Sequence, residues 1–149
     1  MSQVELFVGL KIPDTTAITT LHTIEKMGYK EVKKVKREIY YKFDIEGDAE
    51  KFSKKIGKVD ILVNANKNKY TTEIEKEEGT IHILVKDNDD KCEGLLHTLQ
   101  QRLGLTEIKS MEKGVLWTLY IDSEQKQKIA EEIGNRLLHN ENYQEMKIG

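Results

Sequence analysis

The sequence has little of what a disulfide-bonded, disordered or membrane-spanning chain needs. It holds one cysteine, Cys92, so no disulfide can form within the chain. It holds one proline, Pro13, and no run rich in glycine and serine, which argues against long disordered segments. Its apolar runs are far shorter than the ~20 residues that span a bilayer, and its N-terminus lacks the basic-then-apolar pattern of a secretory signal. We therefore expect a cytoplasmic protein.

An excess of one charge sign is also missing. Lys and Arg number 24 and Asp and Glu number 26, which gives a formal net charge of −2. Because the two signs nearly cancel, no global field draws the chain to nucleic acid or to an anionic membrane, and we expect neither partner. The length of 149 residues allows one domain of ordinary size or two small ones.

Motifs that carry chemistry are absent from the sequence. It contains no GxxxxGK[ST] phosphate loop, no GxSxG nucleophile elbow and no HExxH zinc helix. Cys92 and His97 are five residues apart on a predicted helix, which puts them on different faces, so we interpret Cys92 as a small buried side chain rather than a nucleophile. An acidic run fails the calcium-loop spacing and is better explained as a helix-capping turn: Asp87, Asp89 and Asp90. We predict no catalytic residue, bound cofactor or metal.

The sequence does contain an internal repeat. Leu21, His22 and Thr23 return as Leu96, His97 and Thr98, a shift of 75 residues, about half the chain. Other matches follow at a shift of 76: Gly28 with Gly104, Tyr41 with Trp117, and Ile45 with Ile121. Similarity at a fixed period indicates two copies of one unit of about 70 residues. We assign them to residues 1–76 and 80–149 and expect them to pack as one globular unit.

Each half has the same predicted elements. The first half begins with a strand over 4–10 and a helix that runs from a cap at Asp14 or Thr15 to Gly28. A hairpin over 31–45, which turns near Arg37 and Glu38, follows. A helix over 48–63, capped by Asp48 and with a break expected at Gly57, and a strand over 69–76 complete the half. In the second half the elements are a strand over 81–85, a helix over 92–103 ended by Gly104, a hairpin at Lys113 and Gly114, a helix from a capping box of Asp122 and Gln125 to Asn140, and a strand over 143–148.

This order is the ferredoxin-like β-α-β-β-α-β plan. A four-stranded sheet with helices on one side leaves its other face open, and two such units can cover each other. We therefore predict an α+β fold of two ferredoxin-like repeats packed sheet to sheet about a pseudo-two-fold axis. Tyr41, Phe43 and Trp117 are the large residues expected in the core between them.

One basic cluster is a candidate contact for a phosphate or an acidic partner. It comprises Lys30, Lys33, Lys34, Lys36 and Arg37, of which we name the last four as a candidate partner contact. The alternative, which we favour, is that these residues form the solvated side of the predicted hairpin. The second half has no equivalent run, so a binding role would be asymmetric.

Other polar residues also recur in both halves. His22 and His97 share one repeat position and could pair at a metal or proton site, but no cysteine or carboxylate stands at ligand spacing beside them, so we favour histidines at a helix edge. The repeated asparagines are explained by helix termination and turns: Asn64, Asn66, Asn140 and Asn142.

Taken in order, these pieces resemble the PurS family, the small subunit of phosphoribosylformylglycinamidine synthase. In both halves the first strand ends in lysine (Lys11 and Lys86) and an aspartate opens the helix that follows (Asp14 and Asp90). The Leu-His-Thr run begins at Leu21 and at Leu96, and the closing helix of the second half runs into Leu-Leu-His-Asn, which ends at Asn140. The resemblance covers residues 4–76 and 80–148. PurS is usually a single repeat that dimerises, whereas this chain carries two. Glu38 also stands where the family places a turn glycine, which Gly114 matches, and Asp14 lacks the proline that follows it in many members.

The resemblance implies a role without chemistry of its own. In that family a synthetase subunit (PurL-type) uses ATP and Mg²⁺, a glutaminase subunit (PurQ-type) supplies ammonia, and PurS-like subunits bridge the two and help ammonia pass. ATP and Mg²⁺ would then be bound by the partner, and a further homo-oligomer could form through sheet edges. The alternative is a tandem ferredoxin-like regulatory module that binds a small metabolite at the repeat interface.

Overall fold

The computed structural model describes residues 2–74, 77–87, 92–139 and 144–149. The first half contains β1 (Ser2–Leu10), α1 (Thr15–Lys26), β2 (Val32–Ile45), α2 (Ala49–Ile56) and β3 (Asn68–Thr71). The second contains β4 (Thr80–Asp87), α3 (Glu93–His97), β5 (Ile108–Ile121), α4 (Lys126–Ile133) and β6 (Gln144–Ile148), with π-helical turns at Thr98–Arg102 and Gly134–Leu138. The two halves therefore share one order of strands and helices, and the fold is α+β.

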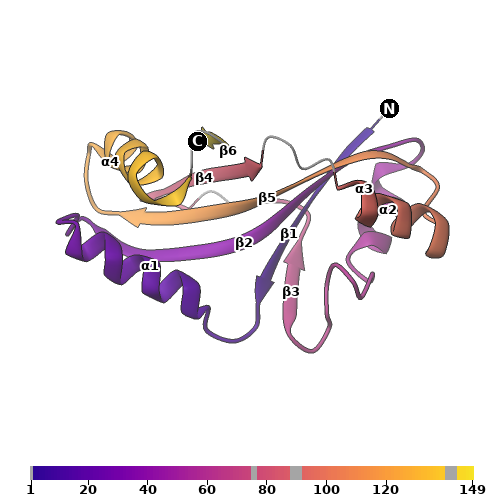
Figure 1. Cartoon of the computed structure of the whole chain (residues 1–149), viewed down its shortest axis with the longest axis horizontal. Helices are drawn as coiled ribbons and strands as arrows, with labels where there is room; N and C mark the ends of the chain where they lie inside the picture. Colours follow the sequence, from indigo (N-terminus) through magenta and orange to yellow (C-terminus); the bar gives the residue numbers. More distant parts are fainter. Residues whose placement is uncertain (1, 75–76, 88–91, 140–143) are drawn as a thin grey trace. The chain divides into compact units, whose positions relative to one another are not determined.

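The two predicted hairpins are wrong. β2 and β5 are each one continuous strand of 14 residues, drawn in Figure 1 as two long uninterrupted arrows. The described strands form one six-stranded sheet in the order β3-β1-β2-β5-β4-β6, in place of the two facing four-stranded sheets that we expected. The residues expected to turn, Arg37 with Glu38 and Lys113 with Gly114, lie inside these strands.

The second helix of the first half is shorter than predicted. α2 ends at Ile56 with Gly57 as its C-cap, so the foreseen break at Gly57 is confirmed, and Val59 and Val63 do not continue the helix. The α2 end approaches β3 so closely that a Cβ atom at position 57 would collide with the ring of Tyr70. Gly57 therefore both ends α2 and allows this contact.

Most helix ends follow the local signals in the sequence. The Asp14 carboxylate accepts hydrogen bonds from the first turn of α1, and Asp48 does the same for α2, as predicted. Gly28 and Gly104 adopt positive φ angles of 97° and 71°, which explains why glycine ends these segments. The predicted capping box before α4 is wrong, because the N-cap residue Gln125 makes no side-chain cap hydrogen bond.

The chain forms two compact units that do not follow its two halves. Unit 1 consists of Met1–Lys11, Ile39–Ile74 and Asp89–Gly114. Unit 2 consists of Ile12–Glu38, Glu75–Asn88 and Val115–Gly149. The boundaries inside the long strands fall after Glu38 and after Gly114, the two places where we expected turns.

The core of unit 1 joins residues from both halves on one face of its strands. The first half supplies residues of β1, β2 and α2, including Leu6, Phe43 and Phe52. The second half supplies residues of the α3 region and the start of β5, including Leu99 and Ile108. Phe43 and Phe52 meet edge to face, with ring centroids 5.5 Å apart.

The core of unit 2 is built in the opposite way. The second half supplies its β4, β5 and α4 residues, including Trp117 and Ile133, while the first half supplies α1 and the start of β2 through Ile24 and Val32. Ile24 and Leu99 occupy matching repeat positions, and both side chains are completely buried. Each half therefore gives its first helix to the core that contains the other half's first strand.

Candidate functional site

The predicted partner contact lies on the first part of β2, in unit 2. Lys33 and Lys34 are exposed, whereas Lys36 and Arg37 are half-buried. The Lys33 ammonium donates to the Lys30 carbonyl oxygen at 3.0 Å. The surface therefore keeps two exposed amines, and its role as a partner contact stays a prediction.

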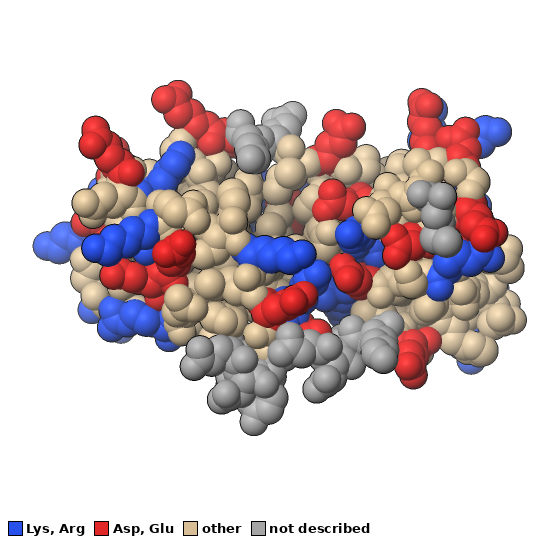
Figure 2. Space-filling view, turned by 90° about the horizontal axis from the view of Figure 1, so that it is seen from above, with Lys and Arg blue, Asp and Glu red and all other residues tan. Residues whose placement is uncertain are grey.

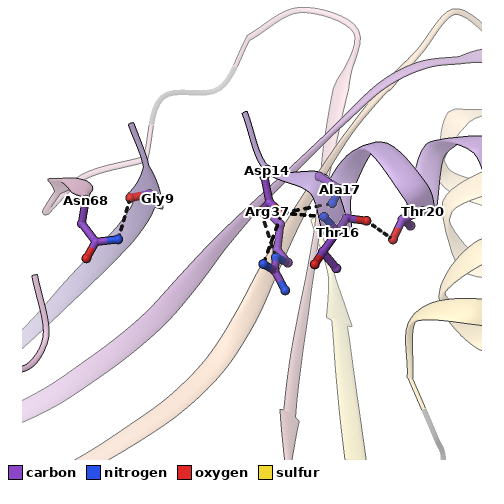
Figure 3. A network of polar contacts seen from close by, with 7 residues as sticks. All are labelled: Gly9, Asp14, Thr16, Ala17, Thr20, Arg37 and Asn68. Atoms are coloured by element: carbon purple, nitrogen blue, oxygen red, sulfur yellow. Dashed lines mark hydrogen bonds and ion pairs between the residues drawn. The ribbon is translucent and has the colours of Figure 1, made fainter. Parts of the chain in front are cut away.

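Arg37 has a structural partner, shown in Figure 3. Its Nε and Nη2 atoms contact the two carboxylate oxygens of Asp14 at 3.0 and 3.2 Å. The same carboxylate accepts hydrogen bonds from the backbone N–H groups of Thr16 and Ala17 at 3.0 and 3.2 Å. Arg37 thus ties the start of α1 to β2, which accounts for this member of the basic cluster without a ligand.

The repeated histidines, His22 and His97, are exposed on helices of different units. Among the described residues, no group of three or more His, Cys, Asp and Glu side chains could hold a metal ion. Cys92 is buried in the core of unit 1, as predicted. Of the acidic run, Asp87 accepts a hydrogen bond from Gln144 at 2.8 Å, while positions 89 and 90 lie outside the described residues.

The first pair of repeated asparagines shapes a turn, as predicted. The Asn64 side chain accepts from the Asn66 N–H at 2.9 Å, and the Asn68 side chain accepts from the Asn64 N–H at 3.0 Å. The Asn68 amide also donates to the Gly9 carbonyl at 3.2 Å, which attaches the turn to β1 (Figure 3). The second pair, at positions 140 and 142, lies outside the described residues.

A groove in unit 1, which the sequence reasoning missed, is a candidate binding site. It has a volume of about 730 Å³ and is lined by β1, β2, α2 and the end of β3 with the residues that follow it. Its charged lining residues are Glu5, Lys42, Glu50, Lys54 and Glu73. These positions are spread over about 70 residues of sequence and share no local motif. The sequence signal for this site is limited to the polar residues Gln3 and Glu5, which alternate with buried residues along β1.

The groove is suited to binding by charge and hydrogen bonds. The Tyr40 hydroxyl donates to Glu5 Oε2 at 2.6 Å, and burial together with this bond raises the pKa of Tyr40 well above its usual value. Tyr40 therefore stays protonated and fixes the Glu5 carboxylate. The residues that line the groove include neither cysteine nor histidine.

A second polar cluster lies in unit 2. His82 Nδ1 lies 3.1 Å from the hydroxyl of the buried Thr118 on the neighbouring strand. Beside it, the Lys34 ammonium sits over the Tyr120 ring at 5.2 Å. Burial, followed by the charge and hydrogen bond of Glu77, raises the pKa of Tyr120. The groove of unit 1, which has a defined volume, remains the better candidate site.

The charge distribution matches the near-neutral composition. Figure 2 shows basic and acidic side chains interspersed over the face that it draws. Such a mixture favours specific contacts over long-range attraction to a polyanion. Among the described helices, none combines the length and apolar character that crossing a bilayer requires.

Comparisons with known proteins assign no family. No family model matches the chain. No curated protein matches it in sequence either.

Proposed function

We propose that this chain is a non-catalytic, PurS-like subunit of phosphoribosylformylglycinamidine synthase. In this role it bridges a PurL-type synthetase and a PurQ-type glutaminase and aids ammonia transfer in purine synthesis. The observation that carries the proposal is the pairing of two halves with one element order, each of which gives its first helix to the other half's core. This arrangement supports the interpretation of the chain as two copies of one PurS-like unit. ATP and Mg²⁺ belong to the synthetase partner in this proposal.

The finer fold proposed here is ferredoxin-like within each unit. In unit 1, the six positions of the plan are taken in order by β1, α3, the first part of β5, the second part of β2, α2 and β3. This is the β-α-β-β-α-β plan with one helix and one strand taken from the other half. Unit 2 takes the equivalent elements with the roles of the two halves exchanged. The matching composition of the two units supports a pseudo-two-fold pair.

The lining of the groove suits a binding role. It consists largely of lysines, carboxylates and hydroxyl groups, which can bind a partner by charge and hydrogen bonds. Two units of matching construction also suit a bridge, because a subunit between two enzymes needs two contact surfaces.

The test is reconstitution with the synthetase and glutaminase subunits of the same organism. We expect the three chains to co-purify with ATP and glutamine present. We also expect formation of the amidine from glutamine to need this chain, while formation from ammonium salt does not. Full glutamine-dependent activity without the chain, and no association, would overturn the proposal.

The candidate contact can be tested in the same assay. If Lys33 and Lys34 touch an acidic surface, Lys33→Glu with Lys34→Glu should weaken association, more so at low salt. Lys51→Glu with Lys58→Glu, the same double charge reversal on exposed residues of unit 1, is the matched control. Equal association of the two variants would remove these lysines from the interface and leave the bridging role intact.

A second function is favoured by the groove itself. A space of about 730 Å³ lined by both charge signs would suit a zwitterionic metabolite, as in a regulatory module. This site lies within unit 1, whereas the sequence led us to expect one at the repeat interface. A thermal-shift screen with amino acids and nucleotides distinguishes the two functions: stabilisation by one ligand, with no binding to the two enzymes, would favour the regulatory module.

A further inference from the structure

One edge of β1 is only partly covered by its neighbour. β3 pairs with β1 from Phe7 to Leu10, where Phe7 stands opposite Thr71. Within the described part of the chain, no strand lies beside Ser2–Leu6 on this side. Residues Thr72 and Glu73, which follow β3, line the groove, and no backbone hydrogen bond joins Glu73 to Glu5. The groove of unit 1 therefore runs along an open strand edge.

The alternation of hydrogen bonds fixes which backbone groups point into it. Lys11 donates its N–H to the Lys67 carbonyl oxygen at 2.9 Å, in register with the β1–β3 pair. In an antiparallel ladder every second residue directs its N–H and C=O to the same neighbour. Gln3 and Glu5 therefore direct theirs away from β2, toward the groove, and the side chains of both also line it.

We propose that this edge binds an extended segment of a partner protein, which adds to β1 as a further strand. In strand addition the main-chain hydrogen bonds supply affinity, and the alternate side chains of the added segment supply specificity. A groove of about 730 Å³ lies in the size range of specific ligand sites. The inference rests on the edge of β1 alone and does not depend on the PurS-like role.

The helix side of the groove determines the apolar positions of the added segment. Val4 is buried there in the core of unit 1, and Ala49 of α2 packs partly against that core. Tyr70, opposite Val8 on the same face, keeps 39% of its surface exposed although it is a large aromatic residue. Every second side chain of the added strand would meet this apolar strip, so these positions take Val, Ile or Leu.

The other side of the groove determines the charged positions. Glu5 and Gln3 are exposed on the opposite face of β1. Over the whole lining, which includes Glu50 of α2 and Glu73, three carboxylates face two lysines. A basic side chain opposite Glu5 would complement this excess of negative charge. The occupant is therefore an extended segment in which basic and apolar residues alternate.

Fluorescence anisotropy with the full chain tests the proposal. The probe is a labelled octapeptide of alternating Lys and Val, compared with a peptide of alternating Glu and Val. We expect one-to-one binding and a clear preference for the Lys peptide. Gln3→Pro deletes the N–H that points to the groove and leaves the β1–β2 ladder intact, so it should weaken binding roughly fivefold, about the effect of one hydrogen bond.

A second variant keeps the test decisive if proline disturbs folding. Glu5→Lys should reverse the preference toward the Glu peptide, while Glu25→Lys, the same charge change on α1 of unit 2, should leave it unchanged. Circular dichroism monitors the fold of each variant. Equal affinity for both peptides, or no effect of Gln3→Pro and Glu5→Lys, would overturn the proposal. So would sedimentation that shows a dimer from which the Lys peptide is excluded, because a second copy would then occupy the edge.

Discussion

Replacing Ile24 by alanine should destabilise the strands of the other half of the chain. Ile24 belongs to α1 of the first half, yet its side chain is buried in the core that contains β4, β5 and α4. An arrangement with closed hairpins would place α1 against β1 and β3 of its own half. The effect of one substitution on strands distant in sequence therefore tests the exchange directly.

The expected size follows from burial. The side chain of Ile24 is 0% exposed, and removing a fully buried isoleucine costs about 2–5 kcal/mol through lost burial and the cavity left behind. Even the lower figure, about 2 kcal/mol, raises the open population of a locally unfolding unit roughly 30-fold. We expect amide hydrogen exchange in β4 and β6 to accelerate by at least this factor, with much smaller changes in β1 and β3.

A matched variant reverses the prediction. Leu99 occupies the equivalent position in the second half and is also fully buried, but in the core with β1 and α2. Leu99→Ala should therefore accelerate exchange in β1 and β3 and spare β4 and β6, as followed by mass spectrometry. Acceleration of β1 and β3 by Ile24→Ala would refute the exchange of helices. Equal acceleration everywhere would refute the separate unfolding of the two units.

Three further predictions concern single contacts. Asp14→Ala removes both the cap of α1 and the partner of Arg37 and should lower the free energy of unfolding by about 1–2 kcal/mol in urea titrations, whereas Asp14→Asn keeps the cap and should cost less. Burial opposes ionisation of Glu107, but the hydrogen bond and charge of Lys55, 2.6 Å away, prevail and lower the pKa of Glu107. The stability that this ion pair adds is therefore complete above about pH 4.3 and is lost as pH falls through the lowered pKa. Glu107→Gln should flatten that part of a plot of Tm against pH. Because the pKa of Tyr40 is raised, its contribution to the free energy of unfolding is complete below about pH 10 and is lost as pH rises further. Tyr40→Phe should remove this alkaline loss of Tm.

The local elements could be predicted because their determinants are neighbours in sequence. Asp14 and Asp48 lie within three residues of the N–H groups that they cap, and Gly28 and Gly104 supply a positive φ at their own positions. Helical periodicity alone likewise predicts a buried Ile24, because Ala17, Leu21 and Ile24 recur at helical spacing and form an apolar stripe, and the side chain is completely buried. None of these inferences requires knowledge of where the helix packs.

The partner of each helix could not be predicted in the same way. A stripe on α1 reports that the helix has a buried face, and the strands of either half offer a matching apolar face. The groove has the same difficulty, since Glu5, Glu50 and Glu73 come together only through the pairing of β1 with β3 and the packing of α2. For the groove, periodicity could indicate that Glu5 is exposed, but not that β3 stops before reaching it.

The choice between a hairpin and a straight strand depends on turn chemistry that the first half lacks. Tight two-residue hairpins need positive φ angles that favour glycine or asparagine, and Arg37 with Glu38 offers neither. In the straight strand Arg37 instead holds Asp14, and Glu38 is buried within 3.7 Å of Lys36. Gly114 has the required freedom but takes no positive φ. Once β2 is straight, α1 lies in unit 2, and the equivalent helix α3 packs in the core of unit 1 instead. Because β5 follows α3 and pairs with β4 in unit 2, it runs from unit 1 into unit 2 as a straight strand as well.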